Sequence, residues 1–158
     1  MLDALAAIVG DKGLLVDGKE MDPFVTDWRG RRKGKALAVV SPASAAEVSA
    51  VVSLAAREGQ PVFPLGGNTG LCFGAVPESG DPARPGIVLS LRRMNRIRAI
   101  DRDDNVATVD AGVVLADLHA AAAEAGRSFP LHLGSEGSAQ VGGLISTNAG
   151  GTGVLRYG

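Results

Sequence analysis

Two clusters of glycine constrain the fold of this chain more than any other feature of its sequence. The chain has 158 residues and 22 glycines, and the glycines crowd into residues 59–80 and 134–158. Their share is about 14%, twice the usual share of roughly 7%. Because glycine tolerates a positive φ and lets the backbone come close to another group, such clusters indicate tight turns or backbone held against a ligand.

Composition and charge argue against several classes of function. Hydrophobic residues make up 46% and charged residues 21%, which is typical of an ordinary globular domain. The net charge of -1 gives no reason to expect nucleic acid or an anionic membrane as a partner, and the basic stretch 29–35 is expected to be a solvated loop. The single cysteine, Cys72, excludes an internal disulfide. No apolar run reaches the roughly 18 residues of a membrane span, so the cytoplasm is the default location.

Hydrophobic periodicity and turn residues predict an α+β fold. The predicted elements are a short amphipathic helix over 1–10, a strand at 36–40, a helix over 44–59, strands at 61–65 and 86–90, a hairpin of 96–100 and 106–110, and a helix over 115–125. Ser44 and Glu47 have the spacing of a capping box. Residues 11–35 are expected to be irregular. Residues 36–65 therefore predict a parallel, right-handed βαβ unit, and the later hairpin begins an antiparallel part.

The first segment that can carry chemistry is Pro64-Leu-Gly-Gly-Asn-Thr-Gly70, at the end of a predicted parallel strand. Ligands of open α/β sheets bind at that end of the strands. Successive backbone amides can form a nest for a phosphate, and the side chains of Asn68 and Thr69 can donate further hydrogen bonds. A glycine-rich turn without a ligand is the alternative interpretation.

Two other phosphate-binding motifs do not fit this loop. A P-loop needs a lysine after its second glycine, and every lysine of this chain precedes Gly66. The Rossmann fingerprint needs the spacing G-x-G-x-x-G at the start of a helix. Gly66-Gly-Asn-Thr-Gly70 lacks that spacing, and residues 71–77 are a poor helix. Nucleotide hydrolysis and NAD binding of the Rossmann type are therefore not expected.

The second segment is rich in small residues and hydroxyls. It begins at Gly134-Ser-Glu-Gly-Ser138 and continues from Val141 to Gly151, with no basic side chain before Arg156. A dinucleotide bound here would be held by backbone amides and hydroxyls, whose oriented dipoles can replace a counter-ion.

The paired motifs resemble those of a known family. The residues that carry the resemblance cover nearly the whole chain, in order: 64–70, 95–97, 110–112, 129–131, 145–151 and 156–158, with a shorter match at Asp27-Trp-Arg-Gly30. They resemble FAD-linked oxidoreductases of the vanillyl-alcohol-oxidase/PCMH type, in the branch of D-2-hydroxyglutarate and D-lactate (glycolate) dehydrogenases. Cys72-Phe73 departs from this family, which usually has small or aliphatic residues there.

The resemblance implies a PCMH-type FAD-binding domain in two subdomains, 1–92 and the incomplete 93–158, with the cap domain absent. It implies that the first loop wraps the FAD pyrophosphate and that the second segment lines the flavin and its ribityl-phosphate chain. The implied cofactor-binding residues are Pro64, Leu65, Gly66, Gly67, Asn68, Thr69, Gly70, Gly134, Ser135, Gly137, Ser138, Gly142, Gly143, Thr147, Asn148, Ala149 and Gly150. Some relatives link FAD covalently through a histidine where this chain has Asn68, so FAD is expected to be non-covalent.

The resemblance places the catalytic residues outside this chain. Family members continue beyond the position of Gly158, and the metal-binding and proton-abstracting histidines of hydroxyglutarate-like members lie in that later part. His119, within a predicted helix, is expected to be a surface or structural residue. His132 lies beside the second segment and could approach the flavin, but it is not assigned a catalytic role. No metal set is expected.

By resemblance, the parent reaction is oxidation of a D-2-hydroxy acid (2-hydroxyglutarate, lactate or glycolate) to the 2-oxo acid. In that reaction a base takes the hydroxyl proton and hydride passes to the flavin. This chain would supply binding and orientation. Two alternatives remain: a truncated flavin-binding module without turnover that needs another chain, and a binder of some other phosphate ligand. An unfinished antiparallel sheet would also leave an open edge, which favours self-association.

Overall fold

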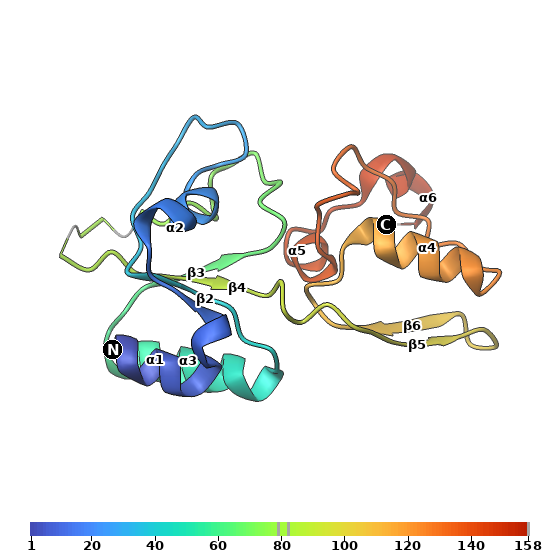
Figure 1. Cartoon of the computed structure of the whole chain (residues 1–158). Helices are drawn as coiled ribbons and strands as arrows, with labels where there is room; N and C mark the ends of the chain where they lie inside the picture. The colour runs from blue at the N-terminus through green and yellow to red at the C-terminus, as the bar shows by residue number, and fades with distance from the viewer. Residues whose placement is uncertain (79, 82, 158) are drawn as a thin grey trace. The chain divides into compact units, whose positions relative to one another are not determined.

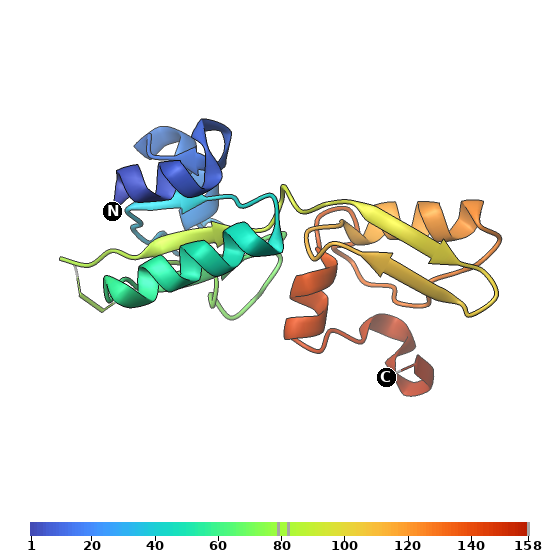
Figure 2. The same cartoon turned by 90° about the horizontal axis from the view of Figure 1, so that it is seen from below.

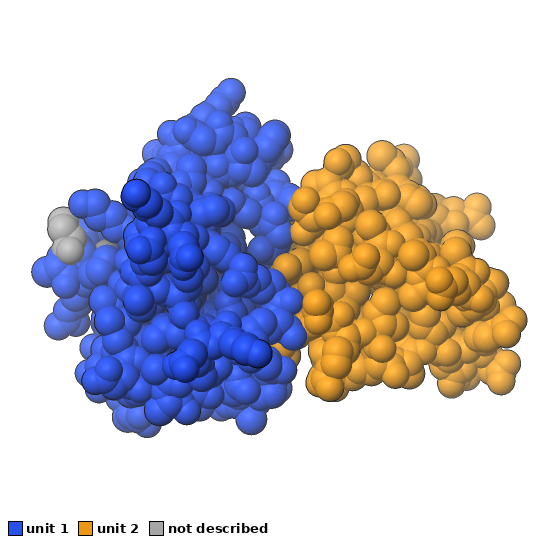
Figure 3. All heavy atoms as spheres, in the orientation of Figure 1, with its two compact units in different colours: residues 1–93 blue, residues 94–158 orange. Residues whose placement is uncertain are grey.

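The computed structural model describes residues 1–78, 80–81 and 83–157 (Figure 1). The chain divides into two compact units, which we call unit 1 (Met1–Arg93) and unit 2 (Met94–Gly158) (Figure 3). Residue 79 of the glycine-rich stretch 59–80 and residue 158 of the final motif 156–158 lie outside the described residues. No helix in the described part of the chain is both long and apolar enough to cross a membrane.

Unit 1 is built on a four-stranded sheet with the order β1-β2-β4-β3. Strands β2 (Ala38–Val40) and β3 (Val62–Leu65) both run parallel to β4 (Ile87–Ser90), while the short β1 (Leu14–Leu15) is antiparallel to β2. The predicted strands and their parallel direction are confirmed. The strands of the expected βαβ unit are not neighbours, however, because β4 lies between β2 and β3.

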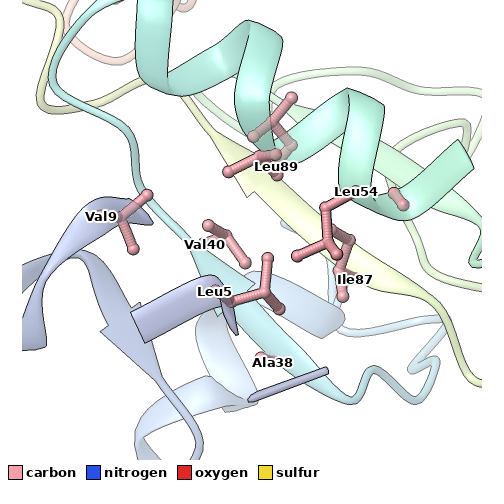
Figure 4. Close-up of a cluster of buried hydrophobic side chains, with 9 residues drawn as sticks. Leu5, Val9, Ala38, Val40, Leu54, Ile87 and Leu89 are labelled. Atoms are coloured by element: carbon pink, nitrogen blue, oxygen red, sulfur yellow. The ribbon is translucent and has the colours of Figure 1, made fainter. Parts of the chain in front are cut away.

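Helices cover both faces of this sheet. Helices α1 (Leu2–Val9) and α3 (Ala45–Arg57) pack on one face, and α2 (Gly18–Val25) packs on the other (Figures 1 and 2). Side chains of the strands alternate between the two layers, as strand geometry requires. The α1/α3 side holds the cluster drawn in Figure 4, whose labelled members are Leu5, Val9, Ala38, Val40, Leu54, Ile87 and Leu89. The α2 side holds Met21, Val25, Val39, Leu65 and Val88.

The capping box at the start of α3 is confirmed, with one difference in its partner. The hydroxyl of Ser44 accepts a hydrogen bond from the backbone N–H of Glu47 at 3.2 Å. The carboxylate of Glu47 accepts from the N–H of Ala43 at 2.8 Å, one residue before the cap residue itself. Both bonds satisfy amides near the helix start and fix where α3 begins.

The expectation that residues 11–35 are irregular is wrong for the 3-10 turn Asp11–Gly13, for strand β1 and for Gly18–Val25, which form α2. Its N-cap is Asp17, whose carboxylate accepts hydrogen bonds from Lys19 and Glu20 at 2.9 and 3.2 Å. Met21 and Val25, one helical turn apart, are buried against the sheet. Packing of this apolar pair overrides the internal Pro23 and the polar composition of the segment.

Unit 2 combines an antiparallel hairpin with helices. Strands β5 (Ile97–Asp101) and β6 (Val106–Val109) pair as predicted, and α4 (Leu115–Glu124) contacts β5 (Figure 2). Buried Val113, Leu115, Leu118, Ala122 and Ala139 form its interior. The remaining elements are α5 (Val141–Ser146), a 3-10 turn at Gly151–Gly153 and α6 (Val154–Tyr157). Large apolar side chains stay exposed, among them Val106, Ile145, Leu155 and Tyr157.

A buried carboxylate holds the base of the hairpin. The side chain of Asp110 is 1% exposed and forms ion pairs with Arg96 and Arg98. Burial raises the pKa of Asp110, but hydrogen bonds from Arg98 and Arg96 outweigh it and hold the pKa below its usual value of 3.8. Because its pKa is lower in the folded unit, the Asp110 carboxylate stays ionised there to a lower pH than in the unfolded chain.

We expect this ion-pair cluster to give unit 2 a stability that is lost in acid. A group whose pKa is lower in the folded state binds protons more readily when unfolded, so its stabilising effect is complete above about pH 4 and disappears as pH falls through the folded pKa. Wild type should therefore exceed Asp110→Asn in urea stability near neutral pH, and the difference should shrink below about pH 4. A difference that does not change with pH would contradict this account.

Candidate functional site

The first predicted loop follows β3 directly, at the carboxyl end of the parallel strands. Leu65 is buried beneath it, and Gly66 to Thr69 are half-buried. Asn68 adopts a left-handed conformation with φ 54°. Its side-chain amide donates a hydrogen bond to the carbonyl of Thr26 at 2.8 Å, so it ties the loop to the end of α2. The Asn68 side-chain nitrogen is therefore engaged with the protein rather than held free for a phosphate.

The backbone amides of this loop lack partners. In the part of the chain that the structure describes, the N–H groups of residues 66–70 donate no hydrogen bond to any other group of the protein. Gly66 to Thr69 are half-buried and Gly70 is exposed, so the partner of these donors is water or a ligand. Five successive unpaired donors at the carboxyl edge of a parallel sheet are chemically suited to an anion with several oxygens.

A basic turn frames the loop. The guanidinium of Arg29 donates to the carbonyl of Leu71 at 3.0 Å and lies 5.5 Å from the ring centre of Phe73. Arg32 lies 5.0 Å from the same ring. The buried carboxylate of Asp27 accepts hydrogen bonds from the backbone N–H groups of Arg29 and Arg32. The stretch 29–35 is mostly exposed, as expected, but its first arginine is packed against the loop and adds positive charge there.

The second predicted segment lies entirely in unit 2. Its first part is a turn in which the N–H groups of Gly134, Ser135 and Gly137 have no recorded partner among the described residues. Its second part is α5 and the turn that follows, where the hydroxyl of Thr147 donates to the carbonyl of Gly143 at 2.9 Å. A largely apolar hollow of about 750 Å³ lies beside α5, and three predicted residues line it: Gly142, Asn148 and Ala149.

Several glycines of these segments are not required by the fold. Six described glycines have an ordinary φ and open space where a Cβ would lie: Gly18, Gly70, Gly74, Gly134, Gly137 and Gly143. Five of these six lie within or beside the two predicted segments. Gly142 differs, because a Cβ there would lie 2.8 Å from the Cβ of Ala111. Neither backbone nor packing demands a glycine at these positions, so a side chain there would meet only something outside the chain, such as a ligand of the two segments.

The structure also gathers three side chains that the sequence pattern left separate. His119 in α4, His132 in the following loop and Glu136 in the next turn place one ligand atom each within 4.8 Å of one another. A hydrogen bond from His132 lowers the pKa of Glu136 most, while burial raises it and the N–H of Leu133 lowers it further. In the sequence, only the i,i+4 spacing of His132 and Glu136 indicates that two of these side chains could lie close together. No sequence pattern links this pair to His119, which is in another element.

The two predicted segments therefore present different chemical groups, each within its own unit. Pro64–Gly70 presents unpaired amides at a sheet edge of unit 1. The residues from Gly134 to Gly150 present unpaired amides, hydroxyls and an apolar hollow in unit 2.

Two dehydrogenases are similar in sequence to this chain over most of the chain's length. It is 39% identical to a D-2-hydroxyglutarate dehydrogenase of Xanthomonas citri pathovar viticola, over 92% of the chain and 30% of that protein. It is 46% identical to a D-lactate dehydrogenase of Archaeoglobus fulgidus, over 80% of the chain and 27% of that protein. The chain thus spans less than a third of the length of these relatives.

Solved structures share the fold. An alkyldihydroxyacetonephosphate synthase matches 98% of the chain and 30% of its own, with a TM-score of 0.85 and 25% identity. A p-cresol methylhydroxylase matches 78% of the chain and 24% of its own, with a TM-score of 0.67 and 22% identity, which shows the PCMH-type fold alone. The family model described as FAD binding domain matches residues 36–158. This match covers well over half of the chain, which therefore belongs to the FAD binding domain family and has the α+β fold of the PCMH-type flavoproteins.

Proposed function

We propose that this chain is the part of a flavin-dependent D-2-hydroxy-acid dehydrogenase that binds FAD, and that it binds FAD without a covalent bond. The observation that carries the proposal is the row of unpaired backbone amides at residues 66–70, at the carboxyl end of β3. The family of the chain supplies the identity of the ligand.

The first loop would hold the FAD pyrophosphate. Pro64 and Leu65 end β3 and orient the loop, and the amides of Gly66 to Gly70 are the donors. Arg29 lies at the edge of the same loop, where its guanidinium contacts Leu71 and Phe73 and pairs with Asp27 at 3.8 Å. This arrangement fits an anion, since backbone dipoles and a nearby arginine both favour negative charge.

The second segment would line the flavin and its ribityl-phosphate chain. The free amides of Gly134, Ser135 and Gly137 suit phosphate and ribityl oxygens, and Ser138 adds a hydroxyl. The remaining residues of this segment are at α5 and after it: Gly142, Gly143, Thr147, Asn148, Ala149 and Gly150. The adjoining hollow is mostly apolar, as a flat ring system prefers.

The side chain at position 68 supports non-covalent binding, because some relatives link FAD through a histidine at this place. An amide is not a nucleophile, and the amide nitrogen of Asn68 is already bonded to Thr26. Asn68 therefore serves to shape the loop.

The proposed reaction of the parent protein is oxidation of a D-2-hydroxy acid to the 2-oxo acid, where bound FAD supplies the hydride acceptor. The names of the relatives support this, since they are dehydrogenases of D-lactate and D-2-hydroxyglutarate. Because the chain spans under a third of their length, we assign its residues to binding and orientation. A flavin-binding module without turnover is the second candidate, favoured by the exposed Ile145, Leu155 and Tyr157, which suit a surface covered by another chain or a second copy.

The absorption spectrum of the chain tests the proposal. After mixing with FAD and desalting, we expect flavin bands to remain with the protein and to pass into the filtrate when the protein is denatured. Riboflavin, which lacks the pyrophosphate, should not be retained, because the amides of residues 66–70 then have no anion to bind. Equal retention of riboflavin would contradict the role of the first loop, and flavin that stays with the denatured chain would contradict non-covalent binding.

A further inference from the structure

The two histidines of the whole chain lie together, which is the starting point of this inference. His119 and His132 are the sequence's only histidines, and their ring centres are 4.7 Å apart. They come from different elements, α4 and the loop that follows it. Glu136 lies beside both rings: its Oε2 is 3.6 Å from Nδ1 of His119, and its Oε1 is hydrogen-bonded at 3.0 Å to Nδ1 of His132, whose proton a metal ion bound at that atom would displace. Two imidazoles and a carboxylate thus converge on one point of unit 2.

The hydrogen bond of His119 fixes which of its nitrogens is free. Nε2 lies 2.9 Å from the carbonyl oxygen of Leu131, and a carbonyl only accepts, so Nε2 carries the proton. In the neutral ring, Nδ1 then presents a lone pair. It faces an oxygen of Glu136 at 3.6 Å, which is too long for a hydrogen bond. Two acceptors therefore face each other across a gap, an arrangement that a cation between them would stabilise.

The supporting contacts resemble those of built metal sites. A metal-binding histidine commonly donates its second N–H to a backbone carbonyl, as His119 does to Leu131. The carboxylate of Glu136 is held by the N–H of Leu133 at 3.2 Å. The His132 side chain is 60% exposed, which gives an ion a path from solvent.

We propose that His119, His132 and Glu136 form a binding site for a divalent transition metal of the zinc class. Two imidazoles and one carboxylate are a common zinc donor set, with the fourth position left to solvent. Imidazole donors disfavour magnesium and calcium, which prefer oxygen. The three ligands are not among the residues assigned to FAD, although Glu136 lies within the turn Gly134–Ser138 that we propose to bind it. A bound ion would clamp α4 to residues 131–136, and so order the turn at Gly134–Ser138.

The test uses the full chain without a polyhistidine tag. Zinc is titrated against a chromophoric chelator, and melting is followed with zinc, with magnesium and with neither. We expect one zinc per chain and a higher melting temperature with zinc alone. His132→Ala should weaken zinc binding by more than the 10–100-fold that loss of a supporting contact costs. Circular dichroism should show that this variant stays folded, because the side chain is mostly exposed.

Two further variants separate this site from other donors. Cys72→Ser removes the chain's single thiol, which is exposed, and should bind zinc as wild type does. Glu136→Gln keeps the size of the side chain and should lose affinity as His132→Ala does. Absence of zinc binding, equal binding by His132→Ala, or loss of binding in Cys72→Ser would each overturn the proposal.

Discussion

Replacing Gly70 or Gly137 by leucine is expected to weaken FAD binding by about 10–100-fold, since forcing a side chain into a filled contact costs typically 1–3 kcal/mol. Both positions have an ordinary φ and open space in the protein alone, so the leucine should fold without strain. Only the bound cofactor would then meet the new side chain. Titration of FAD against each variant, followed by flavin fluorescence, measures the change.

Gly18→Leu is the matched control for this experiment. Gly18 also has an ordinary φ and open surroundings, but it lies at the start of α2 and belongs to neither predicted segment. It should leave FAD affinity unchanged. The three variants should melt at the same temperature without FAD. If the Gly70→Leu and Gly137→Leu variants bind FAD as tightly as Gly18→Leu does, neither Gly70 nor Gly137 adjoins the cofactor.

Leu5→Ala and Leu115→Ala are each expected to lower the free energy of unfolding of their unit by about 2–5 kcal/mol, the range for a buried leucine that leaves a cavity. Both side chains are fully buried: Leu5 lies between α1 and the sheet of unit 1 (Figure 4), and Leu115 lies in the interior of unit 2. Urea unfolding gives the size of the loss. Hydrogen exchange shows which unit is destabilised. Leu5→Ala should lower the protection of backbone amides most in unit 1, and Leu115→Ala should lower it most in unit 2.

The same substitution at an exposed leucine serves as the control. Leu155 lies fully in solvent, so Leu155→Ala should change the free energy of unfolding by no more than about 0.5 kcal/mol. A loss at Leu115 no larger than that at Leu155 would show that unit 2 lacks a packed interior.

The local elements were predictable where one sequence signal decided them. The capping box at Ser44 fixes the start of α3, and Gly126, with φ 70°, follows the end of α4. The alternation around Asp101 to Asn105 predicts the hairpin, since Asp101 accepts hydrogen bonds from the turn and Asn105 takes a positive φ. The first loop was predictable because its glycines follow an apolar strand directly.

Features set by contacts far apart in the sequence were not predictable in this way. The placement of β4 between β2 and β3 depends on pairing Ile87 with both Ala38 and Val62, and no local pattern encodes that choice. The cluster of His119, His132 and Glu136 depends on how the loop after α4 folds back. The tie from Asn68 to Thr26 depends on α2, a helix held by packing rather than by its own composition.

The central position of β4 has a consequence for how the protein is made. Strand β3, which carries the first loop, lies at the edge of the sheet and pairs with β4. During synthesis, residues 62–70 therefore leave the ribosome before the strand that anchors them exists. Pairing of β3 waits for residues 87–90, and such non-local pairing is slow compared with helix formation. If the first loop binds FAD as proposed, it reaches its folded form for that binding only after residues 87–90 have been made and paired with β3.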